Sequence, residues 1–196
     1  MKKKNKQIII LLAILAVVGI ACFSTYNSLV SKDEACMKQW SKVESQYQRR
    51  LDLIPNLINV VKGYAKHEEG TLLKVVEARN NASQMKLDPN NITQEQLDKF
   101  QQSQAELTSA LRSINMVVER YPDLKANQNF LELQEQLEGT ENRIAVERQR
   151  YSDVVNDYNT SIRRFPKNII ASCFGFEKKA YFQAQQGAEN APKVEF

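Results

Sequence analysis

Apolar residues recur at every third or fourth position through most of this chain, and that spacing limits its fold more than any other feature. One turn of an α-helix takes about 3.6 residues, so the spacing places these side chains on one helical face. The stripes run from Cys36 to Val75, from Leu97 to Tyr121 and from Phe130 to Phe165. No segment alternates apolar and polar residues over a useful length. The sequence therefore predicts an all-α protein without a sheet.

Turn and cap residues divide the stripes into helices. Thr93 followed by Gln96 has the pattern of a capping box that opens a helix. The other expected breaks are the turn cluster at 87–91, Pro122 with the following cap residue Asn127, and Pro166.

The first stripe is too long for a single bundle helix. A helix from Thr25 to Lys86 would be ~93 Å long, whereas the other two stripes would make helices of only ~42 and ~57 Å. We therefore expect the chain to reverse near His67–Gly70, where Gly70 would end one helix and Thr71 would cap the next. Pro55 lies inside the first helix and is expected to kink it.

The segment before the stripes is suited to a membrane. Ile8 to Phe23 is a run of 16 residues without a charge, which as a helix spans ~24 Å. Four lysines precede the run, so the positive-inside rule predicts a cytoplasmic N-terminus and a bundle outside the cytoplasm. The predicted segments are a basic tail at 1–7, a transmembrane anchor at 8–26, a helical bundle at 27–176 and a C-terminal tail at 177–196.

The predicted fold class is therefore all-α, with an N-terminal transmembrane helix followed by a long up-and-down antiparallel four-helix bundle. An unbroken first helix is the alternative to this bundle.

Two alternatives to a retained transmembrane anchor use the same N-terminal residues. Gly19 to Cys22 partly matches a lipobox, in which Cys22 would be acylated, and the small residues before Cys22 also suit the cleavage site of a signal peptide.

Composition excludes several functions. The net charge of +4 belongs to the N-terminal lysines, and without those four the 23 remaining basic side chains balance 23 acidic ones. A neutral body offers no electrostatic footprint for nucleic acid. His67 is the only histidine, and although His67-Glu68 begins like a zincin helix, Thr71 stands where the second histidine is needed. We therefore expect no catalytic residue, metal site or cofactor.

Two surfaces are candidates for binding. Arg49, Arg50, Asp52, Pro55 and Asn56 are the hypothesised docking patch for a protein partner. We expect Arg49 to pair with Asp52 one helical turn away, which leaves Arg50 free for another helix or another protein. The alternative is that this patch is only a solvated or interhelical ion pair.

The second surface is the membrane end of the bundle, where an up-and-down topology brings the last helix back beside the first. The hypothesised interface residues there are Tyr26, Phe174, Phe176, Lys178 and Lys179, because aromatic rings mixed with lysines suit a membrane surface. Packing over the bundle end is the alternative for these residues. The same topology brings Cys36 toward Cys173, which would allow an extracytoplasmic disulfide.

Several motifs of the chain occur together and in order. They are YNSLV at 26–30, QRRLDLIPNL at 48–57, VKGYA at 61–65, YPDLKAN at 121–127 and TENRIA at 140–145. This set resembles proteins of the LemA family from residue 26 to about residue 176. The resemblance implies a bacterial, membrane-associated helical bundle with no established enzymatic activity, in a family whose genes often neighbour those of membrane metallopeptidases. Some members of the family look like lipoproteins.

The resemblance and the residues together predict a non-enzymatic scaffold or adaptor at the bacterial cell envelope, with an unidentified protein partner. Its expected place is the inner (plasma) membrane, crossed once, with a lipoprotein as the alternative. The alternatives for function are a regulatory partner or cofactor of a membrane metallopeptidase, and a self-assembling envelope protein that forms homo-oligomers.

Overall fold

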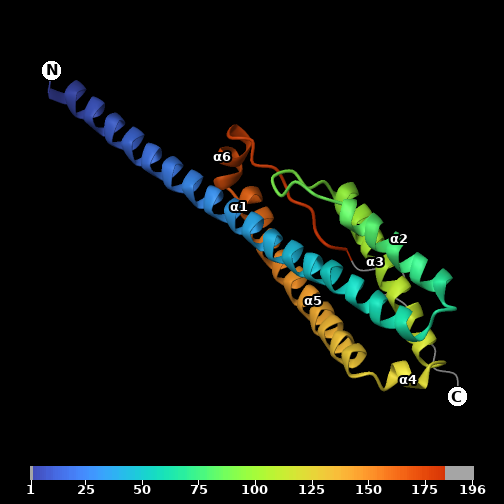
Figure 1. Cartoon of the computed structure of the whole chain (residues 1–196). Coiled ribbons are helices and arrows are strands. Elements are labelled where there is room, and N and C mark those ends of the chain that lie inside the picture. Colours follow the sequence, from blue (N-terminus) through green and yellow to red (C-terminus); the bar gives the residue numbers. More distant parts are fainter. Residues whose placement is uncertain (1, 184–196) are drawn as a thin grey trace, which may run out of the picture.

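The first helix, α1, joins the apolar N-terminal run to the bundle without a break. In the computed structural model, which describes residues 2–183, α1 extends over 63 residues from Lys2 to Tyr64 (Figure 1). It is long and apolar enough to cross a membrane. The large apolar side chains of its first part are all more than half exposed, from Val18 at 51% to Ile20 at 71%. Lipid rather than water is the solvent that suits such a surface.

The remaining helices fold back along the second part of α1. They are α2 (Glu69–Gln84), α3 (Gln94–Val118), the short α4 (Pro122–Lys125), α5 (Gln128–Arg163) and the short α6 (Lys167–Cys173). α5 packs along α1, and α2 packs along α3 (Figure 1). Residues 2–183 contain no strand. The predicted all-α class and the bundle of four long helices are confirmed, and the alternative of an unbroken helix to Lys86 is wrong.

The predicted reversal near His67–Gly70 is confirmed, but its cap residues differ from those predicted. α1 ends at Tyr64 and α2 begins at Glu69, so Gly70 and Thr71 lie in the first turn of α2. The prediction that Gly70 ends a helix and that Thr71 caps the next is therefore wrong. The turn is closed by the Glu68 amide, which donates to the Ala65 carbonyl at 3.1 Å. No left-handed residue is needed there, because within the described chain Gly175 is the only residue with a positive φ.

The local signals at α3 and α5 are confirmed. The Thr93 hydroxyl accepts from the Gln96 amide at 3.2 Å, and the Gln96 side chain accepts from the Thr93 amide at 3.0 Å. The Asn127 side chain caps α5 by accepting from the amide of Phe130. Each cap satisfies an amide that lacks an intrahelical acceptor.

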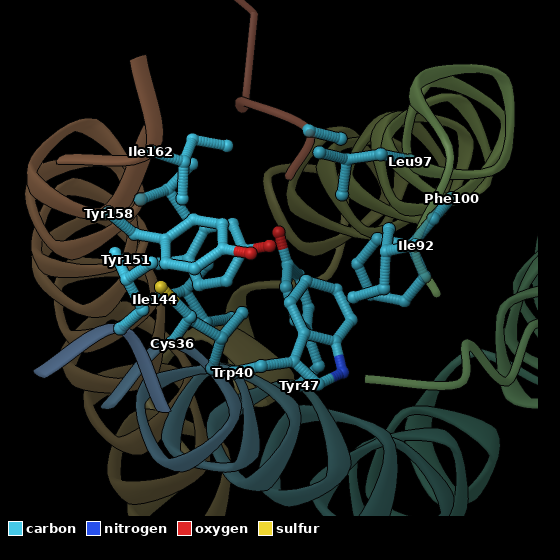
Figure 2. Close-up of a cluster of buried hydrophobic side chains, with 14 of the residues drawn as sticks. Cys36, Trp40, Tyr47, Ile92, Leu97, Phe100, Ile144, Tyr151, Tyr158 and Ile162 are labelled. Carbon is cyan, nitrogen blue, oxygen red and sulfur yellow. The ribbon is translucent and has the colours of Figure 1, made fainter. Parts of the chain in front are cut away.

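The buried side chains form two clusters, one behind the other along the bundle. The cluster nearer the apolar run contains Trp40, Tyr47, Phe100 and Tyr151 (Figure 2). The distal cluster contains Leu51, Ile54, Leu107 and Phe130, among others. The boundary falls between Tyr47 and Leu51 on α1, so the residues between them lie at the junction of the two clusters.

Replacing Thr93 with Ala removes the cap oxygen, and we expect the free energy of unfolding to fall by about 1 kcal/mol. Urea unfolding of the detergent-solubilised full chain, followed by circular dichroism, measures the change. Thr71→Ala is the matched control, since Thr71 lies inside the first turn of α2 rather than at its cap. Equal losses in the two variants would contradict the capping role.

Candidate functional site

The junction between the two apolar clusters is a polar layer centred on Arg50. Arg50 is 1% exposed. Its guanidinium donates to the Thr108 hydroxyl at 3.1 Å, and it also bonds to the Gln104 amide oxygen and the Glu141 carboxylate. The planar group thus ties α1 to α3 and α5 at one level, which a lysine with its single ammonium could not do.

Of the two predicted uses of Arg50, which were bonding to another helix and bonding to another protein, the structure shows the first. Because its side chain is buried and bonded to two neighbouring helices, Arg50 is not free for another protein. The alternative of an interhelical ion pair describes it correctly. The predicted pair of Arg49 with Asp52 is also wrong: Gln48, four residues before Asp52, donates to its carboxylate at 2.7 Å.

Arg49, Asp52, Pro55 and Asn56 remain at the surface. Arg49, Asp52 and Asn56 are spaced three and four residues apart, which places them on one side of α1. Beside Arg49 lies a hollow of about 550 Å³ between α1 and α5. Its lining includes three exposed glutamates of α5, which are Glu132, Glu135 and Glu138. We call Arg49, Asp52, Asn56 and these glutamates the Arg49 face.

Pro55 creates a second polar contact between helices. A proline has no amide hydrogen, so the carbonyl of Leu51, four residues earlier, loses its intrahelical donor. The Arg79 side chain of α2 takes the place of that donor, with its Nε 3.0 Å from the Leu51 oxygen. α1 continues through Pro55 to Tyr64. The proline thereby provides an acceptor that fixes α2 against α1.

Three of the predicted membrane-interface residues lie together at the end of the bundle. The Tyr26 ring lies 4.8 Å from the Phe174 ring and 5.8 Å from the Phe176 ring, measured between centroids. Phe174 and Lys178 are exposed. Lys179 instead packs inward, where its ammonium is 2.8 Å from the Asp33 carboxylate and lies over the Tyr158 ring. Lys179 is therefore a structural residue of the bundle end.

The segment that follows α6 runs along the bundle in an extended conformation that the sequence did not predict. Residues 177–183, expected as part of a C-terminal tail, lie against α3 and α5; residues 184–196 of that tail are outside the described chain. Asn159 of α5 accepts from the Lys179 amide and donates to its carbonyl, both at 2.9 Å. Gln94 of α3 holds Tyr181 in the same way. We call residues 177–183 the strap.

The strap completes the cluster near the apolar run. Ala180 is buried, and the Phe182 ring stacks on Trp40 and meets Tyr151 edge-on. The Arg148 guanidinium carbon also lies over the Phe182 ring, 4.6 Å from its centroid. In the sequence, only the alternation of the apolar residues Ala180 and Phe182 indicates an extended segment here, and two residues are too few for such a prediction.

The residues that could have belonged to a catalytic or metal site, His67, Glu68 and the cysteines, are not brought together in one. His67 is exposed, and Glu68 accepts from Arg120 at 2.9 Å and from the Tyr121 hydroxyl. Among the described residues, no group of three or more His, Cys, Asp or Glu could hold a metal ion. Cys36 is buried, Cys173 is exposed, and both are free thiols. Burial raises the pKa of the Cys36 thiol to about 11, which leaves it unreactive near neutral pH.

Arg50→Ala is expected to lower the free energy of unfolding by about 2–4 kcal/mol, because it strands the buried Gln104 amide oxygen and opens a cavity. Arg49→Ala removes the exposed neighbouring arginine and should change that free energy by less than about 0.5 kcal/mol. Urea unfolding of both variants measures the difference. Similar losses would show that the polar layer does not hold the three helices together.

The role of Arg79 is tested by a double-mutant cycle with Pro55. Arg79→Met should cost about 1 kcal/mol, because the Leu51 carbonyl then has no donor. In a Pro55→Ala background the cost should shrink, since the new backbone amide can donate to the same carbonyl. An unchanged cost in that background would mean that Arg79 stabilises the bundle by some other contact.

Comparison with known proteins shows which family the chain resembles and how much of the chain the match covers. The model of the LemA family matches residues 39–196. Magnetosome proteins MamQ 1 and MamQ 2 of Paramagnetospirillum magneticum are each 24% identical over 200 residues, which cover 91% of this chain and 74% of the relative. Protein LemA of Metamycoplasma hominis is 22% identical over 160 residues, which cover 82% of this chain and 69% of that protein. The family match thus begins on α1 beyond the apolar run and includes the strap.

Proposed function

This chain belongs to the LemA family, and we propose that it is a membrane-anchored, non-enzymatic helical scaffold that holds other proteins at the bacterial cell envelope. The observation that carries the proposal is α1, a single helix whose first part has an apolar, exposed surface and whose second part is a wall of the bundle. Such a helix keeps the bundle surfaces at a fixed height above the membrane. Relatives named as LemA and magnetosome proteins support a bacterial setting.

The proposed location is the bacterial inner (plasma) membrane, crossed once. We place the N-terminus in the cytoplasm and the bundle outside it, on the strength of the four lysines before the apolar run. Acylation of Cys22 would be the other way to anchor the same bundle. Either anchor leaves the bundle as the working part of the protein.

A non-enzymatic role is supported by what the polar residues do. Arg50 and Glu141 bond to each other across helices, Glu68 bonds to Arg120, and Lys179 bonds to Asp33. These polar groups thereby bond within the bundle itself, and the buried Arg50 does so as expected of a residue that specifies helix register. None of these contacts joins a nucleophile to a general base.

The Arg49 face is the surface that we assign to a protein partner. Three glutamates line the hollow against two arginines, Arg49 and Arg143, and Asp52 adds a fourth exposed carboxylate on α1 outside the hollow. A partner with a basic segment therefore suits this face, because charge complementarity steers association and excludes acidic competitors. The hollow beside Arg49 offers a recess of about 550 Å³ for a side chain of that segment.

In-cell cross-linking followed by detergent purification and mass spectrometry tests this proposal. We expect a stoichiometric envelope protein to be captured by the wild type and lost in the variant Glu132→Lys/Glu135→Lys, which repels a basic segment. Glu69→Lys/Glu77→Lys is the matched control, because it reverses the charge of two exposed glutamates on α2. The control variant should retain the partner.

Each other outcome contradicts part of the proposal. Cross-links only between copies of this chain would favour a self-assembling envelope protein. A partner retained by both charge-reversed variants would exclude the Arg49 face as its docking site. Capture of a membrane metallopeptidase, with altered peptidase activity in the absence of this protein, would replace the general scaffold by a regulator of that enzyme.

A further inference from the structure

The short helix α6 turns one side into the bundle and leaves apolar side chains on the other. On the inner side, Ala171 is 3% exposed and Ile170 packs against the neighbouring cluster. Ile169 on the outer side is 52% exposed, and Phe165 and Phe174, which lie just before and just after the helix, are 81% and 61% exposed. The body of the protein has no comparable group of large apolar side chains so close together in the sequence among its described residues. We call these three residues the α6 face.

The α6 face lies at the level where α1 leaves its apolar run. Tyr26 follows the last residue of that run, Phe23, by three residues, or ~4.5 Å along the helix. Its ring contacts both Phe174 and Phe176. Figure 1 shows α6 beside α1, next to the point where the free stretch of α1 reaches the bundle. If the apolar run crosses a membrane, the α6 face must lie at its surface.

The charges within the α6 segment are positive, and two of the acids near it, Asp157 and Asp33, are paired with Lys32 and Lys179, while Glu177 follows the segment. From Tyr158 to Phe176 the sequence has no Asp or Glu, whereas it contains Arg163, Arg164 and Lys167. Arg163 and Arg164 are exposed and directly precede Phe165. Exposed aromatic and aliphatic side chains next to cations are the combination that binds the interfacial region of an anionic membrane.

The α6 face is also held firmly to the bundle. The Phe176 amide donates to the Ala171 carbonyl at 2.9 Å, through a turn that Gly175 permits with a φ of 73°. Directly after this turn, Lys179 bonds to Asp33 of α1 and to Asn159 of α5. A contact between α6 and a membrane would therefore constrain the whole bundle and not only a loose loop.

We propose that the α6 face is a second membrane-contact site, in which Phe165, Ile169 and Phe174 enter the headgroup region while Arg163 and Arg164 bind anionic phospholipid. The inference rests on the proposed anchoring by α1 and adds to it. One helix alone lets a bundle swing about its point of exit, whereas a second contact beside it fixes the tilt. The tilt in turn decides which bundle face is presented parallel to the membrane.

The test uses the full chain in lipid nanodiscs, with a bimane fluorophore on the exposed Cys173 after Cys22→Ser and Cys36→Ala substitution. Lipids with a doxyl group near the headgroup should quench the fluorophore, and they should quench it more in discs that contain phosphatidylglycerol than in phosphatidylcholine discs. A fluorophore attached through Asp123→Cys, at the distal end of the bundle, should not be quenched. Circular dichroism confirms that every variant is folded.

Substitutions separate binding from simple proximity to the anchor. Phe165→Ser/Ile169→Ser/Phe174→Ser should remove most of the quenching, whereas the control Leu131→Ser/Val146→Ser, which changes exposed apolar residues of α5, should leave it intact. Arg163→Gln/Arg164→Gln should remove the additional quenching that phosphatidylglycerol causes.

Two results would overturn the α6 face as a membrane contact. One is the absence of quenching at Cys173 in chains that remain in the nanodisc. The other is quenching that the triple serine variant leaves unchanged, because the anchor alone would then bring the fluorophore near the lipid. Failure of the chain to enter nanodiscs would instead contradict the anchor. Failure to capture a cross-linked partner would concern only the scaffold proposal. The α6 face, the anchor and the scaffold can therefore fail separately.

Discussion

α1 has to satisfy two environments along one unbroken helix, and the rest of the structure depends on this constraint. Its first part exposes apolar side chains on every side, whereas from Leu29 onward one stripe of the same helix is buried in the bundle. No break separates the two parts. α5 packs along α1, and α2 and α3 are placed by the turn after Tyr64. The direction of α1 therefore sets the position of every other element relative to the membrane.

The contacts within the bundle explain how one arrangement of helices is selected. Apolar stripes with a repeat of three and four tolerate a shift of one heptad at modest cost. A buried guanidinium does not, because Arg50 finds its acceptors on α3 and α5 at a single register. The Leu51 carbonyl freed by Pro55 and the strap around Phe182 add two further contacts of defined position. Together these contacts hold the long helices of the bundle in one register.

Local signals in the sequence were sufficient for the helices but not for the site. Thr93 and Asn127 were predicted correctly because a cap depends on residues three positions away. The role of Arg50 depends on acceptors 54 and 91 residues away, which no local pattern reveals. The stacking of Phe182 on Trp40 was not predicted, because an extended strap has no helical period. Gly70 was misassigned because the turn between α1 and α2 closes through ordinary backbone conformations.

Hydrogen–deuterium exchange of the full chain in nanodiscs tests the continuity of α1 most directly. The informative peptides cover residues 23–33, where the helix passes from the apolar run into the bundle, and residues 36–47, which line the core, serve as the reference. A rigid junction predicts slow exchange at 23–33, comparable with that at 36–47. Rapid exchange at 23–33 with slow exchange at 36–47 would reveal a hinge and would contradict a bundle held at fixed height and tilt.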